Sequence, residues 1–294
     1  MNRKSIIALI TFALVILVAV YLFISLPGKS QTPPYDAIPV DAAGFVKIRN
    51  YDDFLQTLQE KSIYWQSVEE ISFTQNLVAR FHGLASLIQK HALLHKIINQ
   101  NAVYISFHEF GKDKVSLVHY IPFSQSATKN QLKTLANQIN SAQTRIGERQ
   151  YNGETIYQIK PEHQKKPLFV CYLNGIAVLS PHNLLVEKVI RQIHLAGSIK
   201  TNQAFRKVKE TAGKYVDANF YINHEYFSKI PEGFLAQPYR SKLENAELFG
   251  NWTELDISFR NNSLLLNGFT YSRDSSGNYI NIFTGQKPQR AEII

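Results

Sequence analysis

Small groups of histidine residues are the first places where this sequence could do chemistry. His91 and His95 are four residues apart in a helical pattern, so their side chains share a helix face and could bind one metal ion. The residues between them, 92–94, are Ala, Leu and Leu, and they lack the general-base glutamate of a zinc protease. His108 and His119 lie on the two arms of a predicted hairpin and are offset along it. We interpret both pairs as ordinary histidines and assign no metal site.

Cys171 and the paired acids give equally weak chemical signals. Cys171 lies in an apolar strand pattern, which is typical of a buried small hydrophobic residue, and no base that would activate it can be placed. Asp52–Asp53 and Glu69–Glu70 are adjacent acids on predicted helices, where the helix dipole and solubility account for them. The sequence has no Gly-x-Ser-x-Gly elbow and no phosphate-binding glycine loop. We therefore predict no catalytic, metal-binding or cofactor-binding residue and no cofactor.

A charge-free apolar run over residues 6–26, preceded by Arg3 and Lys4, is the strongest signal in the chain. A helix rises about 1.5 Å per residue, so this run spans roughly 30 Å, the thickness of the hydrocarbon core of a bilayer. A cleaved signal peptide is the alternative, but the run is longer than a signal core and ends in bulky residues. Flanking basic residues favour the cytoplasmic side. We predict a single-pass inner-membrane protein, anchored in the lipid bilayer through residues 6–26, with a cytoplasmic N-terminus and its bulk in the periplasm.

Composition limits the compartment and the class of partner. The chain has 1 cysteine, so no intrachain disulfide can form, and its position excludes an N-terminal lipid anchor. An extracytoplasmic domain without disulfides favours a bacterial envelope. The net charge is +9, but the basic residues are scattered among acids, and the predicted location argues against nucleic acid. Four aromatic residues near the start of the chain either line a docking surface or, as we favour, pack in the core: Tyr35, Tyr51, Tyr64 and Trp65.

Turn signals and periodic apolar patterns predict the elements behind the anchor. Asn152–Gly153 and Asn174–Gly175 are strong hairpin turns, and residues 111–114 separate two further strands. Ser180 and Pro181 predict the start of a helix that Gly197 closes. Strands are predicted over residues 43–49, 103–107, 115–121, 149–151, 155–159, 168–173, 176–179, 217–222, 253–259 and 263–271. Helices are predicted over residues 52–60, 75–99, 124–139, 181–196 and 203–211.

Hairpins interleaved with helices predict an α+β fold, in which a single N-terminal transmembrane helix precedes antiparallel sheet with helices packed on one face. One sequence pattern occurs twice, at residues 45–54 and at 217–227: a strand, then an asparagine, then a helical turn that contains aromatic residues. We interpret this faint internal echo as a weak similarity and not as an established repeat. The predicted organisation is a cytoplasmic stub and anchor (1–27), a tether (28–40), an α+β domain that a break near 198–214 could divide in two (41–285), and a tail or the entry to a further domain (286–294).

Several short segments together resemble a known group of proteins. They are Ile38–Ala43, Phe45–Ile48, Val103–His108 followed by Gly111–Asp113, and Phe283–Pro288. With the anchor, they make the chain similar to uncharacterised membrane-anchored envelope proteins of Bacteroidota that carry an extracytoplasmic domain of unknown function. The resemblance implies an envelope location and a chain that continues beyond Ile294, and it carries over no catalytic residue.

Together these observations predict a membrane-anchored binding or scaffolding protein of the bacterial cell envelope, with an envelope protein as its partner. One alternative is an envelope hydrolase whose site assembles from residues dispersed in the sequence. Another is an accessory subunit of a larger envelope complex. A pocket that gathers a histidine, a carboxylate and a hydroxyl with shifted pKa values would favour the enzyme, whereas a broad exposed aromatic patch without such a pocket would favour the binding protein.

Overall fold

The computed structural model describes residues 33–61, 101–111, 115–122, 144–161, 167–195, 197–227, 248–260, 263–273 and 277–287. Over these residues the protein has an α+β fold dominated by antiparallel sheet. The predicted anchor (6–26) and the helices predicted over 75–99 and 124–139 lie outside the described residues. Within the described part, no helix combines the length and the apolar character that crossing a membrane requires.

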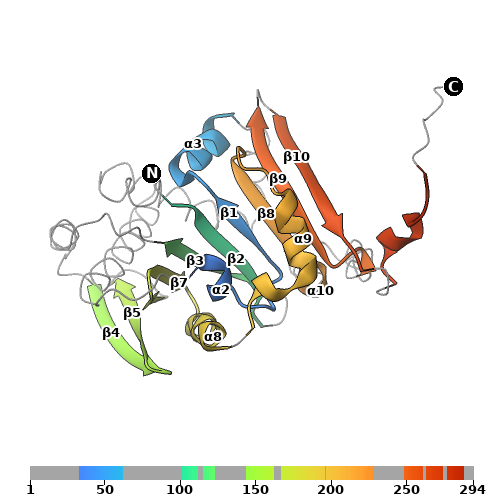
Figure 1. Ribbon diagram of the computed structural model, residues 1–294. Coiled ribbons are helices and arrows are strands. Elements are labelled where there is room, and N and C mark those ends of the chain that lie inside the picture. Colours follow the sequence, from blue (N-terminus) through green and yellow to red (C-terminus); the bar gives the residue numbers. More distant parts are fainter. Residues whose placement is uncertain are drawn as a thin grey trace.

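In the described part of the chain, one sheet of 10 antiparallel strands forms the framework, in the order β10-β9-β8-β1-β2-β3-β7-β6-β5-β4 (Figure 1). It continues across the break predicted near 198–214, because β1 (Gly44–Ile48) pairs directly with β8 (Ala218–Asn223). The other strands are β2 (Val103–Glu109), β3 (Val115–Pro122), β4 (Thr144–Tyr151), β5 (Glu154–Pro161), β6 (Leu168–Leu173), β7 (Ile176–Ser180), β9 (Trp252–Arg260) and β10 (Ser263–Tyr271).

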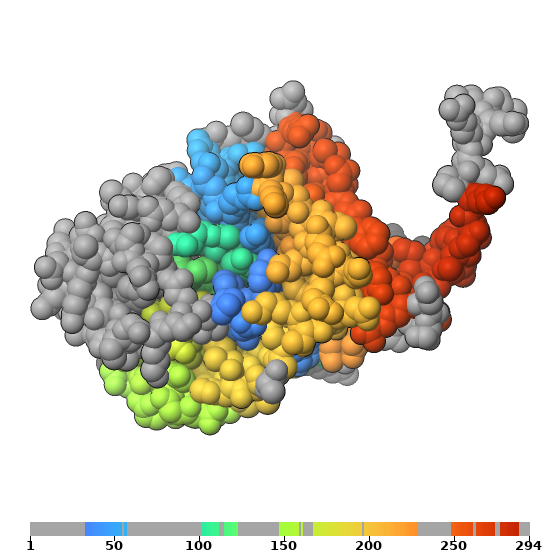
Figure 2. Space-filling model, viewed as in Figure 1, coloured from blue at the N-terminus to red at the C-terminus, as the bar shows by residue number. Residues whose placement is uncertain are grey.

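Helices cover both faces of this sheet, unevenly. α2 (Pro34–Ala37), α8 (Asn183–His194), the 3-10 turn η1 (Ile199–Thr201) and α9 (Gln203–Thr211) lie on one face, which we call the helix face (Figures 1 and 2). α3 (Tyr51–Lys61) packs Phe54 against Phe259, with ring centroids 5.7 Å apart. Phe259 points away from the helix face, because side chains alternate along β9 and Trp252 points toward it. The prediction that all helices pack on one face is therefore wrong for α3. Two short elements complete the described chain, α10 (His224–Phe227) and η6 (Tyr279–Phe283).

Aromatic side chains fill the core between the sheet and α9. Asn202 caps this helix by accepting a hydrogen bond from the amide of Phe205 at 3.0 Å. Phe205 then lies under the helix, 5.8 Å from the ring of Phe45 and 5.1 Å from that of Trp252. Phe45 stacks on Tyr221 of the neighbouring strand, with ring centroids 4.6 Å apart. The ring of Tyr35 packs against Phe45 in this core, and Tyr51 is fully buried. For these two residues, the prediction that the early aromatic side chains pack in the core is confirmed.

The predicted hairpins are confirmed, and one predicted helix start is wrong. Asn152–Gly153 and Asn174–Gly175 have φ values of 50°, 80°, 45° and 96°, which a type I′ turn requires. Ser180, predicted as a helix N-cap, is instead the last residue of β7, and α8 begins at Asn183. Its hydroxyl donates to the backbone oxygen of Leu117 at 3.0 Å, so it joins β7 to β3 rather than capping the helix.

The internal echo corresponds to two units of the same topology. Helix α2, strand β1, helix α3 and the hairpin β2–β3 form the first, and α9, β8, α10 and the hairpin β9–β10 form the second. β1 and β8 pair antiparallel about Val46 and Phe220, and each is flanked on its outer side by its own hairpin. A local two-fold axis normal to the sheet therefore relates the units and makes β10 the counterpart of β3.

Candidate functional site

The residues singled out by their chemistry do not converge. Cys171 in β6 is fully buried, as predicted, and burial raises the pKa of its thiol. His108 and His119 point to opposite faces of the sheet, because the register pairs His108 with Ser116 and Ile105 with His119. The pair His91 and His95 and the acids at 69–70 lie outside the described residues. Asp53 lies on α3, where its amide donates to the side chain of Asn50 at 3.3 Å as a helix cap.

A serine–histidine contact lies in the core of the helix face. Ser106 and His108 are two residues apart on β2 and so share a face, with Oγ and Nε2 2.7 Å apart. The hydroxyl of Tyr120 on β3 lies 3.0 Å from the same Oγ. The three side chains are 0%, 1% and 0% exposed, respectively. The network is therefore closed to solvent and to any substrate.

His108 lacks the properties of a general base. Burial, followed by the charge of Lys188, lowers the pKa of His108 from 6.5 to about 3, so the ring stays neutral. Its Nδ1 is buried without a hydrogen-bond partner among the described residues, where a catalytic histidine would have an orienting carboxylate. The two-residue spacing of Ser106 and His108 could have predicted from the sequence that they share one face of a strand. Their contact with Tyr120 could not be predicted in this way, because it depends on the register of the β2–β3 hairpin.

A second polar cluster, which sequence reasoning missed, joins β8, β9 and the loop after α9. The side-chain amide of Asn219 donates to Asp256 at 2.7 Å and to Glu254 at 3.3 Å. The backbone amide of Gly213 donates to both oxygens of Asp256, at 2.8 and 3.0 Å. A side chain at Gly213 would place its Cβ 2.5 Å from Asp256 Oδ2, so it would displace the carboxylate of Asp256 or the loop. We call these four residues the acid cluster.

The surroundings of Glu254 in the acid cluster favour its protonated form. The residue is 1% exposed, and burial together with a hydrogen bond and charge repulsion from Asp256 raises its pKa from 4.5 to about 8. One carboxyl oxygen, Oε2, has no hydrogen-bond partner in the described part of the chain. The sequence signal for this cluster was the alternation of side chains along β9, which places Trp252, Glu254 and Asp256 on the same, core-facing side of the strand. Sequence alternation alone does not show which residue contacts Glu254, because that depends on the pairing of β9 with β8.

The register extends this cluster into a polar row across the sheet. Asp256 pairs with Asn219, Asn219 with Lys47, Lys47 with Tyr104, and Tyr104 with Tyr120. Burial and the charges of two neighbouring cations lower the pKa of Lys47. The row consequently brings an acid, an amide, an amine and two phenols onto one face, but α9 and the aromatic core cover it. Its arrangement supports packing and electrostatic roles rather than substrate binding.

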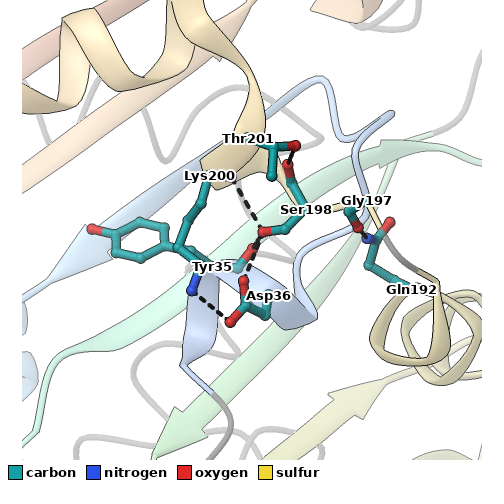
Figure 3. Close-up of polar contacts among 7 residues, drawn as sticks. All are labelled: Tyr35, Asp36, Gln192, Gly197, Ser198, Lys200 and Thr201. Atoms are coloured by element: carbon teal, nitrogen blue, oxygen red, sulfur yellow. Dashed lines mark hydrogen bonds and ion pairs between the residues drawn. The ribbon is translucent and has the colours of Figure 1, made fainter.

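A third network fastens α2 to the helix face (Figure 3). Asp36 accepts a hydrogen bond from Ser198 Oγ at 2.7 Å and pairs with the ammonium group of Lys200 at 2.6 Å. Gln192 of α8 donates to the backbone oxygen of Gly197 at 2.5 Å and accepts from the amide of Val40 at 3.1 Å. Residues 34–37, within the predicted tether, thus form a helix held to α8 and η1, and Ala37 is fully buried.

The accessible candidate is the outer edge of the sheet at β10. This strand of 9 residues, Ser263–Tyr271, carries no charged residue and no proline, and among the described strands it pairs only with β9. Leu264, Leu265, Leu266 and Phe269 are between 40% and 50% exposed, on both faces of the strand. We call these four side chains with their strand the apolar edge. It is an exposed backbone template flanked by apolar side chains.

The opposite edge of the sheet differs in its chemistry. Strand β4 includes Glu148 and Arg149, both exposed, and Arg149 pairs with Glu187 of α8 at 2.6 Å. Charged side chains on an edge strand oppose the addition of a further strand. The sheet, over the residues that the structure describes, therefore has one protected edge and one that is open to pairing.

Neither metal ligation nor similarity to other proteins adds to this description. Among the residues that the structure describes, no three histidine, cysteine or acidic side chains are grouped so that they could hold a metal ion. The chain matches no protein-family model, no curated protein and no solved structure.

Proposed function

We propose that the protein is a membrane-anchored, extracytoplasmic binding or scaffolding protein of the bacterial cell envelope that binds a protein partner at the apolar edge. The single observation that carries this proposal is the uncharged edge strand β10 with its four exposed apolar side chains. The anchor rests on the apolar run at residues 6–26. The resemblance to envelope proteins of Bacteroidota supports the same location.

The topology supports a strand as the bound element. Strand β3, which occupies the position equivalent to β10 in the first unit, pairs antiparallel with β7. β10 has the same place relative to its own unit, and none of the described strands lies on its outer side. In β-strand addition, backbone hydrogen bonds supply affinity and alternate side chains supply specificity. Leu264 and Leu266 would meet the partner on one face, and Leu265 and Phe269 on the helix face.

The alternative, an envelope hydrolase, has one observation in its favour. Ser106 and His108 are within hydrogen-bond distance, as a nucleophile and its base would be. Their burial and the lowered pKa of His108 oppose that role. An accessory subunit of a larger envelope complex is compatible with the same apolar edge, and stoichiometric co-purification would distinguish it.

The test is capture of the partner through β10. The full chain, with a photocrosslinking amino acid in place of Leu264, is irradiated in the membranes of its source organism, solubilised and purified. We expect one dominant crosslinked envelope protein. Leu266→Lys, which places a charge on the edge, should reduce that product at least about tenfold, because an unpaired charge in a strand interface costs well over 1 kcal/mol.

Gln150→Lys on β4 is the matched control, since it adds the same charge to an exposed position of the opposite edge. It should leave the crosslinked product unchanged. Equal yields from the Leu266→Lys and Gln150→Lys chains, or a chain that crosslinks to nothing and purifies as a strict monomer, would contradict binding at the apolar edge.

A further inference from the structure

The outward surface of α8 combines exposed leucines with basic residues. Leu184, Lys188, Arg191 and Leu195 follow one another at intervals of four, three and four residues, so they form one stripe along the helix and its end. The stripe points away from the core, because the intervening Leu185, Val186, Val189 and Ile190 are buried. Leu184 is 60% exposed and Leu195 is 62% exposed. The two exposed leucines therefore lie at the ends of the stripe, and its two basic residues lie between them.

The outward surface of α9 continues this basic character. Arg206, Lys207 and Lys209 are exposed, and Lys214 is exposed just after the helix. Glu210 is the exposed acid on this helix. Three acids of neighbouring elements are paired with cations, as the next contacts show, whereas Asp256 lies in the acid cluster beside the loop after α9.

The acids around these helices are paired with cations of the same face. Asp36 pairs with Lys200 and Asp41 with Lys188, each at 2.6 Å. Glu187, which is buried, pairs with Arg149 at 2.6 Å. The cations of α9 thus remain as a net positive charge on the helix face. We call Leu184, Arg191 and Leu195 of the stripe, together with Arg206, Lys207 and Lys209, the basic face.

The chain enters the domain on this same face. α2 lies against α8 and η1, and the hydrogen bonds of Asp36 and Ser198 hold it there (Figure 3). Only residues 27–33 separate the end of the apolar run from α2. Seven extended residues reach about 25 Å at most. An anchor in the bilayer would therefore keep α2, on the helix face, within about 25 Å of the end of the anchor, which favours an orientation with this face toward the lipid headgroups.

We infer that the basic face lies against the anionic headgroups of the membrane that holds the anchor. This inference rests on the anchoring in the proposed function and adds an orientation and a second partner, an anionic lipid surface. The arginine and lysine side chains attract the negative headgroups, and Leu184 and Leu195 reach the boundary with the acyl chains. The apolar edge at β10 stays free for a protein.

The buried Cys171 allows a direct test, because a cysteine introduced at the surface is then labelled selectively. The full chain is reconstituted in nanodiscs of phosphatidylcholine, with or without phosphatidylglycerol, that contain a lipid with a nitroxide on its headgroup. A fluorophore on Gln203→Cys reports the basic face, and one on Gln286→Cys reports a site beyond β10. We expect headgroup quenching of the first label, stronger with the anionic lipid, and little quenching of the second.

Charge reversal makes the result specific. Arg206→Glu with Lys207→Glu should lower the ratio of docked to undocked chains at least about 25-fold, since each basic residue near an anionic surface contributes about fivefold. Lys160→Glu with Arg260→Glu changes two other exposed cations by the same charge and should retain the quenching. Circular dichroism of both variants confirms that they fold.

The outcomes separate this inference from the proposed function. Equal quenching of the two labels, or quenching that ignores the lipid charge, would overturn the docking of the basic face while the chain remains in the nanodisc. A chain that does not enter nanodiscs at all would overturn the anchoring on which both proposals depend. Capture of a partner by Leu264 in native membranes tests the apolar edge independently.

Discussion

Glu254 shows how a single residue couples this fold to pH. Its carboxyl group lies 1% exposed beside Asp256, and its pKa is raised to about 8. In the unfolded chain the same group releases its proton near pH 4.5. Between these values the folded state binds more protons than the unfolded state, so the free energy of unfolding falls as pH rises. The native chain is expected to lose stability progressively from about pH 5 to above pH 8.

Glu254→Gln should remove this dependence, because an amide keeps a donor toward Asp256 and cannot ionise. We expect the variant to unfold at a higher denaturant concentration than the natural chain at pH 9, with a gain on the order of 2–4 kcal/mol, and to differ little at pH 5. Urea unfolding at a series of pH values measures it. Glu210→Gln, at an exposed position, should keep the natural pH profile. An identical slope for the Glu254→Gln chain would contradict the assignment of the buried proton.

Connections between elements are as constrained as the elements themselves. The loop from α9 to β8 is fastened to β9 by the two hydrogen bonds from Gly213 to Asp256. This contact explains why a glycine follows α9, although nothing in the local sequence around residue 213 points to a partner 43 residues away.

Gly213→Ala should therefore destabilise the domain by about 1–3 kcal/mol, because the new methyl group would displace Asp256 from the loop. Gly197→Ala is the matched control, since a Cβ added at Gly197, in the α8–η1 loop, would meet no described atom within 4 Å. Thermal unfolding of the two variants gives the comparison. Equal melting temperatures would show that the loop adjusts without cost.

Elements whose signals are local could be predicted from the sequence, and those that depend on distant partners could not. Asn152–Gly153 specifies its hairpin within two residues, and Asn202 caps α9 within three. Ser180 has the local chemistry of a helix cap, but its hydroxyl bonds Leu117, 63 residues earlier. The acid cluster likewise required the pairing of β8 with β9, which no short window of sequence contains.

At the scale of the molecule, the two-fold arrangement of the units determines where stability concentrates. β1, β2 and β8 have strands on both sides, and Phe45, Tyr221 and Phe205 pack over them. The α+β class and most strands follow from the sequence, since hairpins alternate with helices along the chain. The meeting of β1 and β8 does not, because 169 residues lie between Ile48 and Ala218.

Amide hydrogen exchange should follow this arrangement. We expect the slowest exchange in β1, β2 and β8, where opening requires disruption of the core. In β10, amides that point away from β9 should exchange rapidly in the isolated protein and become protected when a partner binds. Exchange measured strand by strand by mass spectrometry tests this. Protection of every β10 amide in the isolated chain would show that the edge is already covered.

The contrast between the two edges also sets a valency. An open-ended polymer needs two complementary surfaces on each subunit, one to receive and one to be received. Over the residues that the structure describes, the sheet has one edge open to pairing, at β10, while Glu148 and Arg149 on β4 oppose edge-to-edge pairing of copies. Binding at the apolar edge, as we propose it, would add one strand to each chain and then stop, so we expect complexes of defined stoichiometry instead of fibres.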